Sequence, residues 1–500
     1  MSIDLAPERR PFVFAACVAA IFTAAVESTI VATAMPTITS ELGGFSLLGW
    51  VFAAYLLTQA VTIPIYGRLA DLYGRKRILF IGLGIFMLGS LLCGLAPNML
   101  ALVIARGVQG IGAGAILPIS FTIVGDAYPA RERVKVQPYL AGIFAGSSII
   151  GPVLGAFIVE NFDWALIFWF NIPIGILAIV MLSTFLREHP RPVEHTIDTF
   201  GALTLTLAIS SLLLALLQAD QLGWWVLPLL AASGALAYLF VNLERRSIEP
   251  LLSPILWRNR IILNSIVSSF LIGSALMGMT AFLPTFLQGV MGQSVSTAGL
   301  TLVVLSFCWP LSSTISARIM LRTTYRVTAF IGCSFLTVGA LIFSIMAGTP
   351  ESFRLAALGG WWPMVGAVFF GFGMGFTNST QHIAMQEASG AKSRGAATSG
   401  FAFMRMVGAA FGTAVLGGVL NLSLTFRLPD IEEPVQILMD PANSAAFTTQ
   451  QLHDLGLGVG DALDNVFWAM LVFALLGFLV ARNTPAIKPG NLAPDENPAH

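Results

Sequence analysis

Long apolar segments recur along the whole chain, and they constrain its fold more than any other feature of the sequence. A run of about 18 or more apolar residues with few charges is typical of a transmembrane helix. Because lipid offers the backbone no hydrogen-bond partners, only a helix satisfies these groups within each segment. The pattern therefore predicts an all-α polytopic membrane protein. Its fourteen segments lie near residues 12–36, 48–66, 78–96, 99–123, 138–159, 164–186, 199–218, 223–243, 262–288, 296–317, 327–347, 362–386, 395–421 and 462–481.

The composition agrees with this fold class. Charged residues make up 10% of the chain and hydrophobic residues 56%, whereas soluble domains carry about 25% charge. The first apolar segment, from Phe12, is too long for the apolar region of a cleavable signal peptide. The chain has no P-loop, no nucleophile motif and no cluster of His, Cys and acidic residues with metal spacing. We therefore expect no enzyme activity, cofactor, metal, ATP or nucleic-acid partner.

Cationic residues alternate between the two sides of the predicted bundle. Of the 26 Lys and Arg residues, 22 lie near the N-terminus, in every second loop or in the C-terminal tail. The opposite loops contain only Arg354 and Arg427, while Arg106 and Arg405 lie inside apolar segments. The positive-inside rule therefore predicts that both termini are cytoplasmic and that the number of crossings is even. The expected location is an inner or plasma membrane.

The segments group as six, two and six. This grouping predicts an N-terminal six-helix lobe over 1–190, two additional central helices with linkers over 191–260, and a C-terminal six-helix lobe over 261–485. A long outside loop is expected over 422–461 and a polar cytoplasmic tail over 486–500. Two six-helix halves are typical of transporters whose binding site lies near the membrane midplane.

One short connection, GRLADLYGRKR, concentrates charge between two apolar segments. Its glycines permit a tight turn and a close approach of helices. Its acid can accept hydrogen bonds from cations or from a helix N-terminus, and its cations can hold the cytoplasmic end together. The residues concerned are Gly67, Asp71, Gly74, Arg75 and Lys76.

This connection resembles the signature loop between the second and third helices of the major facilitator superfamily. The family usually has a cation after the acid, where this chain has Leu72. The resemblance implies that the loop is the cytoplasmic latch of an alternating-access transporter. Asp126 ends the fourth segment just before Pro129, and we expect it to be a latch partner for the loop cations.

Two further segments resemble motifs of the same superfamily. The fourth contains ARGVQGIGAGAILP, in which Arg106 and Gln109 match a motif whose Arg is associated with proton coupling. The fifth contains GSSIIGPVLGA, which is similar to the motif that marks the antiporter branches, although Ala156 stands where the family often has Gly. Its matching residues are Gly146, Gly151, Pro152 and Gly155.

The first and thirteenth segments resemble one branch, the fourteen-helix drug:proton antiporters. The first contains ESTIVATAMPTI, where the acid is Glu27 and the family most often has Asp. The thirteenth contains GFAFMRMVGAAFG, with Arg405. The resemblance covers almost the whole chain and implies the major facilitator fold, with two six-helix lobes and two central linker helices. We expect the protein to act as a monomer.

Glu27 and Arg106 are the predicted proton-coupling residues. Counting about 1.5 Å per residue from Phe12, Glu27 lies about 22 Å into an apolar core about 30 Å thick. An apolar environment disfavours a charged carboxyl, which suits this residue to take up and release protons or to attract a cation. The alternative for Glu27 is a protonated packing residue, and for Arg106 a contact that only joins helices.

A substrate cavity is less clearly marked. Phe and Met are abundant, at 36 and 17 residues, which suits a surface that repacks around varied ligands. Ordinary lipid-facing positions explain the same abundance. Arg405 can bind an anionic group, form a pair between lobes or stabilise the second lobe. The cavity candidates are Glu27, Phe22, Gln109, Met374, Asn378, Gln381 and Arg405.

Taken with the resemblance, these features predict a proton-coupled secondary active exporter of lipophilic, cationic drugs or toxic compounds. The expected partners are a small-molecule substrate, protons and the lipid bilayer. One alternative is an exporter of an amphiphilic metabolite, siderophore or lipid, with Arg405 binding an anionic group. Another is a membrane sensor that does not transport.

Overall fold

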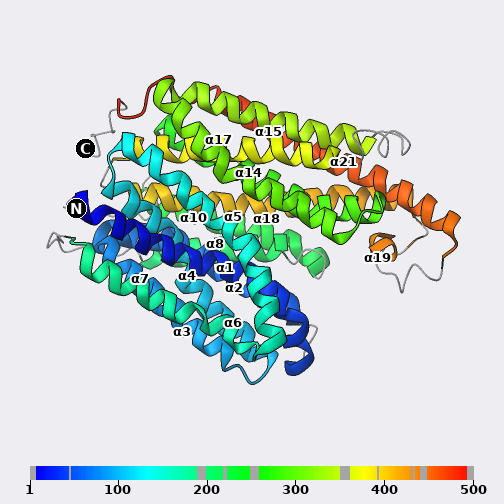
Figure 1. The fold of residues 1–500 in the computed structure, drawn as a ribbon, viewed down its shortest axis with the longest axis horizontal. Helices are drawn as coiled ribbons and strands as arrows, with labels where there is room; N and C mark the ends of the chain where they lie inside the picture. Colours follow the sequence, from blue (N-terminus) through cyan, green and yellow to red (C-terminus); the bar gives the residue numbers. More distant parts are fainter. Residues whose placement is uncertain are drawn as a thin grey trace.

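A computed structural model describes residues 7–43, 47–188, 199–217, 222–247, 258–348, 361–390, 393–429, 431, 434–439 and 447–491. Long helices lie side by side along the longest axis of the molecule (Figure 1). In chain order they are η1 (Pro7–Arg9), α1 (Arg10–Leu42), α2 (Leu48–Tyr73), α3 (Arg75–Gly94), α4 (Met99–Ala127), α5 (Ala130–Asn161), α6 (Ala165–Trp169), α7 (Asn171–Phe185), α8 (Thr199–Leu217), η3 (Gly223–Trp225), α10 (Val226–Glu244), α12 (Arg260–Met277), η4 (Gly278–Phe282), α13 (Leu283–Thr285), η5 (Phe286–Val290), α14 (Val295–Arg322), α15 (Tyr325–Gly348), α17 (Trp362–Ala388), α18 (Arg394–Arg427), α19 (Pro434–Met439) and α21 (Thr449–Ala481).

The described part of the chain confirms the all-α prediction. Each of the fourteen predicted segments coincides with one helix or with consecutive helices. Eleven described helices are long and apolar enough to cross a membrane. Shorter apolar stretches occur at Ile150–Asn161 in α5 and Phe200–Leu216 in α8, and α17 is not among the eleven. The total of fourteen crossings therefore stays a prediction.

The helices pack in two groups that meet along two lines of contact. In one group α1 packs on α4, α5 and α7, while α2 and α3 pack on α4; in the other, α17 packs on α14 and α15, and α12 and α21 pack on α18. The groups meet where α5 contacts α14 and where α2 contacts α18. Figure 1 shows the first group in blue to cyan-green and the second in green to red.

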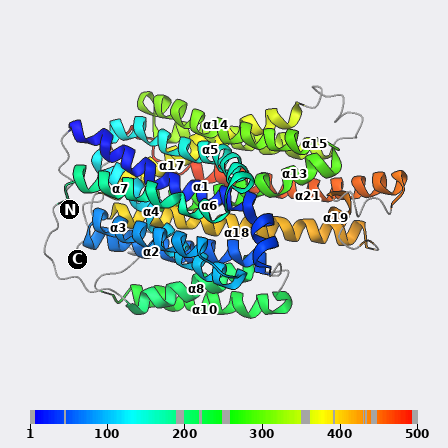
Figure 2. The same ribbon diagram turned by 60° about the horizontal axis from the view of Figure 1, so that its bottom comes forward.

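Helices α8 and α10 lie at the edge of the bundle. They pack on each other, and α8 also contacts α2 and α18 (Figure 2). The predicted linker segments 191–198 and 248–257 lie outside the described residues, as do residues 492–500 of the tail. The boundaries of the three predicted domains stay predictions.

Glycines allow the helices of the first group to approach closely. A Cβ atom on Gly89 of α3 would lie only 2.5 Å from the backbone nitrogen of Gln109 in α4. A Cβ atom on Gly112 of α4 would lie 2.6 Å from the carbonyl oxygen of Gly82. Between helices in lipid, association depends on close van der Waals packing, which small residues permit. These contacts therefore determine how deeply α3 and α4 interlock.

The segment predicted over 262–288 is less regular than a single α-helix. Two π-helical turns, η4 and η5, flank the short helix α13. Pro284 lies between them and has no amide hydrogen to donate to the carbonyl of Thr280, so the regular ladder is interrupted there. The apolar pattern alone did not predict this interruption.

The outside loop predicted over 422–461 is shorter than expected. Helix α18 continues to Arg427 and α21 begins at Thr449, so part of this region is helical, and α19 lies between them. Extending an existing helix needs no new nucleus, and Thr448 and Gln451 form a capping box at the start of α21. Figure 1 shows α21 projecting beyond its neighbours at this end. Within the loop, residues 430, 432–433 and 440–446 lie outside the described part.

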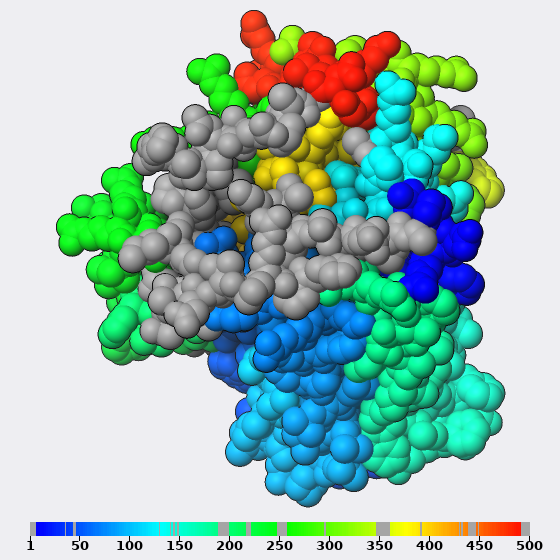
Figure 3. Space-filling model, turned by 90° about the vertical axis from the view of Figure 1, so that its left-hand side faces the viewer, coloured from blue at the N-terminus to red at the C-terminus, as the bar shows by residue number. Residues whose placement is uncertain are grey.

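The described start of the predicted tail is packed against the bundle. The Tyr325 amide donates to the Ile487 carbonyl over 3.0 Å, and the Arg326 amide donates to the Pro485 carbonyl over 3.1 Å. The Gly490 amide donates to the Glu387 carboxylate over 2.9 Å. Figure 3 shows this red C-terminal segment at the end of the bundle where α1 also begins. Residues 484–490 are thus an ordered strap across α15 and α17.

We predict that Gly89→Ala destabilises the protein, because its Cβ atom would press on the backbone of α4. Overpacking of this kind costs about 1–3 kcal/mol, which thermal unfolding in detergent measures as a lower midpoint. Gly84→Ala on the same helix is the matched control, since nothing lies within 4 Å of its Cβ position. Equal midpoints for the two variants would contradict the packing argument.

Candidate functional site

A buried ion pair joins α1 to α4. The Arg106 Nη1 atom donates to the Glu27 Oε1 atom over 2.5 Å. Glu27 is 0% exposed and Arg106 1% exposed. Removing one partner of such a pair leaves an uncompensated buried charge, which costs about 3–5 kcal/mol. The first helix group therefore holds an acid whose charge is balanced by a single neighbouring cation.

Three buried polar groups complete the surroundings of this pair. The Asn171 side-chain amide at the start of α7 donates to the second Glu27 oxygen. The Arg106 Nη1 atom also donates to the Gln109 Oε1 atom over 2.6 Å, and the Gln109 amide donates to the Ser90 hydroxyl over 2.8 Å. The network, which we call the Glu27 cluster, thus consists of Glu27, Arg106, Gln109, Asn171 and Ser90.

Helix packing surrounds the Arg106 guanidinium with partners from α2. It lies 4.2 Å from the centre of the Tyr55 ring of α2, and its Nε atom donates to the Val51 carbonyl over 3.3 Å. Gly110 brings α4 against α2, because its Cβ position is 3.0 Å from the Tyr55 carbonyl carbon. A cation over an aromatic face is stabilised further when it is desolvated. Arg106 therefore has partners that remain when Glu27 is neutral.

The Glu27 cluster can act as a charge switch. With Glu27 ionised, the pair is neutral overall and suits an apolar interior. With Glu27 protonated, Arg106 becomes an excess positive charge, and a rearrangement that gives it a new partner or access to water becomes favourable. A change in the protonation of Glu27 would therefore alter the charge balance where α1, α2, α4 and α7 pack together.

The helix-5 motif packs on α1 next to this cluster. The Thr29 hydroxyl donates to the Ser147 carbonyl over 3.1 Å. Cβ atoms on Gly151 and Gly155 would lie 2.9 Å from the Thr29 Cβ and 3.1 Å from the Ile30 carbonyl oxygen, respectively. Gly146 has nothing within 4 Å of its Cβ position. Helix α5 continues through Pro152, so two of the three motif glycines serve close packing on α1.

The predicted latch residue Asp71 bridges the two helix groups. Its Oδ1 atom accepts from the Gly395 amide over 3.1 Å and its Oδ2 atom from the Ala396 amide over 2.8 Å. These amides belong to the first turn of α18, where a carboxylate is favoured by unpaired donors and the helix dipole. The Arg75 Nη2 atom donates to Asp71 over 2.9 Å. Asp71 therefore caps a helix of the opposite group.

Asp126 adds a second connection between the same groups. Its carboxylate lies 3.2 Å from the Arg75 Nε atom and also pairs with Arg394 of α18. The Arg394 Nη1 atom donates to the Gly125 carbonyl over 3.1 Å. Asp71, Arg75, Asp126 and Arg394 thus form a charged layer, which we call the latch cluster.

Glycines allow the helices that carry the latch cluster to approach one another closely. A Cβ atom on Gly67 would overlap the Ser399 hydroxyl and would lie 2.8 Å from the Gly395 carbonyl oxygen. Gly74 has a φ of +101°, which L side chains rarely adopt, and it separates α2 from α3. Lys76 lies elsewhere: its ammonium donates to the Ser183 and Leu186 carbonyls at the end of α7, over 3.0 and 2.8 Å.

The hydrogen bonds between the two groups gather at one end. Besides the latch cluster, the Gln137 amide of α5 donates to the Gln386 Oε1 atom of α17 over 2.7 Å. The Gln386 amide donates to the Phe121 carbonyl over 3.3 Å. Within the described ranges, every hydrogen bond between the groups lies near the end where α2 finishes and α18 begins. The bundle is closed at this end.

The second-lobe cavity candidates are not brought together with Glu27. Met374 is 0% exposed within a packed apolar core. The Gln381 side chain accepts from the Ser265 hydroxyl over 3.1 Å and donates to the Thr484 hydroxyl over 3.0 Å. Arg405 is half-buried on α18 and forms no ion pair with any residue that the structure describes.

Two cavity candidates remain, Phe22 and Asn378. Phe22 packs against the apolar core next to Glu27, and the Oδ1 atom of Asn378 is buried without a hydrogen-bond partner among the described residues. The cavity roles of Phe22 and Asn378 stay predictions.

The described residues contain no group of three His, Cys, Asp or Glu side chains that could hold a metal ion.

Sequence reasoning missed three residues that complete these clusters. Asn171 binds Glu27, and its position as an amide inside an apolar segment was a usable signal. Arg394 was counted only as a loop cation, although it pairs with Asp126 across the groups. The Glu188 carboxylate accepts from the Arg75 and Lys76 amides over 2.8 and 2.9 Å and so caps α3.

We predict that Glu27→Gln lowers the stability of the protein by about 3–5 kcal/mol, because it leaves Arg106 buried without a counter-charge. Adding Arg106→Gln should recover part of this loss. A double-mutant cycle on thermal unfolding in detergent measures the coupling. The control is Asp461→Asn, whose pair with Arg427 is exposed and is worth about 1 kcal/mol or less. Strictly additive losses would refute the pairing.

We predict that Gly67→Ala holds the latch end open, because its Cβ atom collides with Ser399. The readout is the alkylation rate of a cysteine introduced by Thr398→Cys, a position that is 2% exposed. The rate should rise several-fold, and Ser399→Gly in the same chain should reverse part of the increase. Gly84→Ala is the control for adding a methyl group, and an equal rise there would argue against the latch.

Known proteins resemble this chain over almost its whole length. Residues 17–413 match the model of the Major Facilitator Superfamily. The chain is 34% identical to Multidrug resistance protein 3 of Bacillus subtilis (strain 168), over 95% of this chain and 94% of that protein. It is 31% identical to Multidrug transporter protein MdtP of the same organism, over 90% and 82% of the two chains. The structure of the human organic anion transporter MFSD10 (TETRAN) has the same fold, with a TM-score of 0.62 at 15% identity, and covers 95% of this chain and 100% of that one. The predicted family is therefore confirmed: this multi-pass membrane protein belongs to the Major Facilitator Superfamily.

Proposed function

We propose that the protein exports lipophilic, cationic drugs or other toxic compounds in exchange for protons, by alternating access. The observation that carries the proposal is the buried pair of Glu27 and Arg106 inside apolar helices. Charges at such depth are expensive and mark functional sites in membrane proteins. Relatives named as multidrug resistance and multidrug transporter proteins support the substrate class.

Protonation of Glu27 is the proposed coupling step. It removes the counter-charge of Arg106 and leaves a single positive charge among α1, α2 and α4. The Arg106 side chain then keeps the Tyr55 ring and the Val51 carbonyl as partners, while α1 is released from α4. A shift of α1 relative to α4 is transmitted to α5, which packs on α1 through Gly151 and Gly155.

The latch cluster is the proposed cytoplasmic gate. Its closed geometry corresponds to the state that faces outward or is occluded. Opening requires that Asp71 release the first turn of α18 and that Arg394 release Asp126. Several charge-assisted hydrogen bonds, each worth about 1.5–3 kcal/mol, hold this gate until substrate binding from the cytoplasm or inner leaflet offsets them.

The proposed topology has fourteen crossings, with both termini in the cytoplasm of a cell bounded by an inner or plasma membrane. Helices α1 to α7 form the first lobe and the helices from α12 to α21 the second. Helices α8 and α10 are the two additional central crossings. We propose that the protein works as a monomer, driven by the proton gradient without ATP.

A second candidate function is export of an anionic amphiphile, such as a lipid or a siderophore. The observation that favours it is Arg405, which is half-buried and has no ion pair within the described residues. In this version Arg405 would bind the anionic group.

The test is a flux assay in reconstituted vesicles with an imposed pH gradient and a fluorescent lipophilic cation. The parent should transport the dye, and Glu27→Gln should lose gradient-driven transport by at least tenfold because it cannot bind the proton. Asp461→Asn is the matched control, since it neutralises an exposed acid and should retain flux.

The outcomes separate the candidates. Dye exchange without a pH gradient should survive Glu27→Gln, which distinguishes lost coupling from lost folding. Equal gradient-driven flux in parent and Glu27→Gln would refute the coupling role. Flux of anionic amphiphiles but not cations, abolished by Arg405→Gln, would favour the second candidate. Ligand binding without any flux would favour the sensor.

A further inference from the structure

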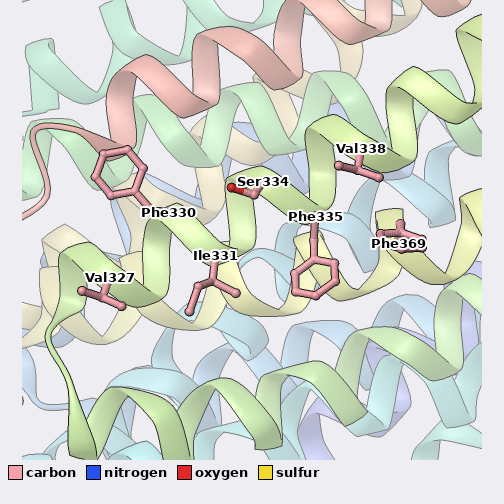
Figure 4. A pocket seen from close by; sticks show the side chains of 7 residues that line it. All are labelled: Val327, Phe330, Ile331, Ser334, Phe335, Val338 and Phe369. Carbon is pink, nitrogen blue, oxygen red and sulfur yellow. The ribbon is translucent and has the colours of Figure 1, made fainter.

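An apolar groove of about 420 Å³ runs along α15 from Val327 to Val338 and is bounded by Phe369 of α17. Figure 4 shows the lining side chains of α15 spaced along that helix, with Phe369 on the neighbouring helix. Val327 is 44% exposed and Val338 39% exposed, and both belong to a helix that meets the criteria for a membrane crossing. The groove therefore opens toward lipid and lies outside the Glu27 and latch clusters.

Aromatic rings give the groove a firm apolar wall. The Phe335 ring lies 5.7 Å from the rings of both Phe369 and Phe372, and 6.0 Å from that of Phe376. At the other end, the Phe330 ring lies 5.1 Å from that of Phe478 in α21. Packed rings of this kind are held in place by several neighbours. Aromatic rings therefore line the groove at both of its ends.

The length of the groove matches one leaflet. Val327 and Val338 are separated by eleven steps of about 1.5 Å each, or about 16 Å along the helix. The apolar core of a bilayer is about 30 Å thick, so the groove spans about half of it. An acyl chain that enters from one surface would follow the groove to the midplane.

Exposed cations gather where the groove reaches the membrane surface. Arg326 directly precedes Val327, and Arg322 ends the neighbouring helix α14. Lys488 follows Ile487, whose carbonyl accepts from the Tyr325 amide over 3.0 Å. All three cations are exposed. The C-terminal strap therefore adds a cation to the two at the ends of α14 and α15.

Glu387, the acid near these cations, already accepts hydrogen bonds from the protein. The Glu387 carboxylate accepts from the Tyr325 hydroxyl over 2.5 Å and from the Gly490 amide over 2.9 Å. The Arg326 Nε atom donates to the Thr484 carbonyl over 2.8 Å, which holds the guanidinium at the mouth of the groove. The mouth is therefore positively charged, whereas the groove itself is apolar.

We propose that this groove binds an anionic phospholipid, with one acyl chain along α15 and the phosphate group against Arg322, Arg326 and Lys488. Charge complementarity selects the ligand, because the cations attract an anionic headgroup and repel a lipophilic cation. With the topology proposed above, the lipid belongs to the cytoplasmic leaflet. Its headgroup would also hold the C-terminal strap on α15.

The experiment is native mass spectrometry of the full-length protein, released from detergent with added phosphatidylglycerol or phosphatidylcholine of the same chain length. The parent should retain phosphatidylglycerol at least fivefold more than phosphatidylcholine. Arg322→Gln combined with Lys488→Gln should lower phosphatidylglycerol retention at least fivefold. The matched control is Arg245→Gln combined with Arg246→Gln, which removes two exposed charges at the end of α10 and should change retention less than twofold.

A groove-filling variant tests the acyl chain separately. Ser334→Phe places a ring in the groove and should lower phosphatidylglycerol retention while leaving the thermal unfolding midpoint unchanged. Equal losses in the two double variants would mean unspecific charge attraction and would overturn the proposal. Full retention in Ser334→Phe, or displacement of the lipid by a lipophilic cation at equal concentration, would overturn it as well.

Discussion

Close contact between helix backbones at glycine is the constraint on which the rest of this structure depends. In lipid, apolar side chains gain little by leaving their surroundings, so helix association relies on dense packing at small residues. Gly89 lets α3 approach Gln109 of α4, and Gly110 lets α4 approach Tyr55 of α2. These two contacts surround Arg106 with Gln109 and Tyr55. The polar surroundings of Arg106 in the first helix group therefore depend on the close approach of these helix backbones.

The Glu27 cluster and the latch cluster both contain buried acids that are paired with cations. In each, acids and cations from different helices neutralise one another where water is scarce. At Glu27 the balance involves one acid and one cation. In the latch cluster, two acids bind two cations and the first amides of α18. In the function proposed above, the buried pair responds to a proton, and the latch cluster responds to the relative position of the two helix groups.

The recurring long apolar segments predicted much of the fold, and the isolated charged residues inside those segments predicted much of the candidate site. The recurring apolar segments were sufficient to predict the all-helical fold class. Glu27 and Arg106 were identifiable because charges inside apolar segments are rare, and the structure places them 2.5 Å apart. Asp126 was predicted as a latch partner, whereas Arg394 was harder to identify, since it lies at the start of a helix, where charge is common. The helical extension of α21 to Thr449 was missed because residues 449–461 mix polar and charged side chains with glycine and lack a continuous apolar run.

The sequence by itself determined which segments are helices and which few charges lie inside apolar segments, because these properties depend on local composition. Only the tertiary structure decided that Asp71 caps α18, that Asn171 reaches Glu27 and that the C-terminal strap meets α15. These contacts join residues far apart in the chain. Their geometry depends on how helices cross, which apolar periodicity does not specify.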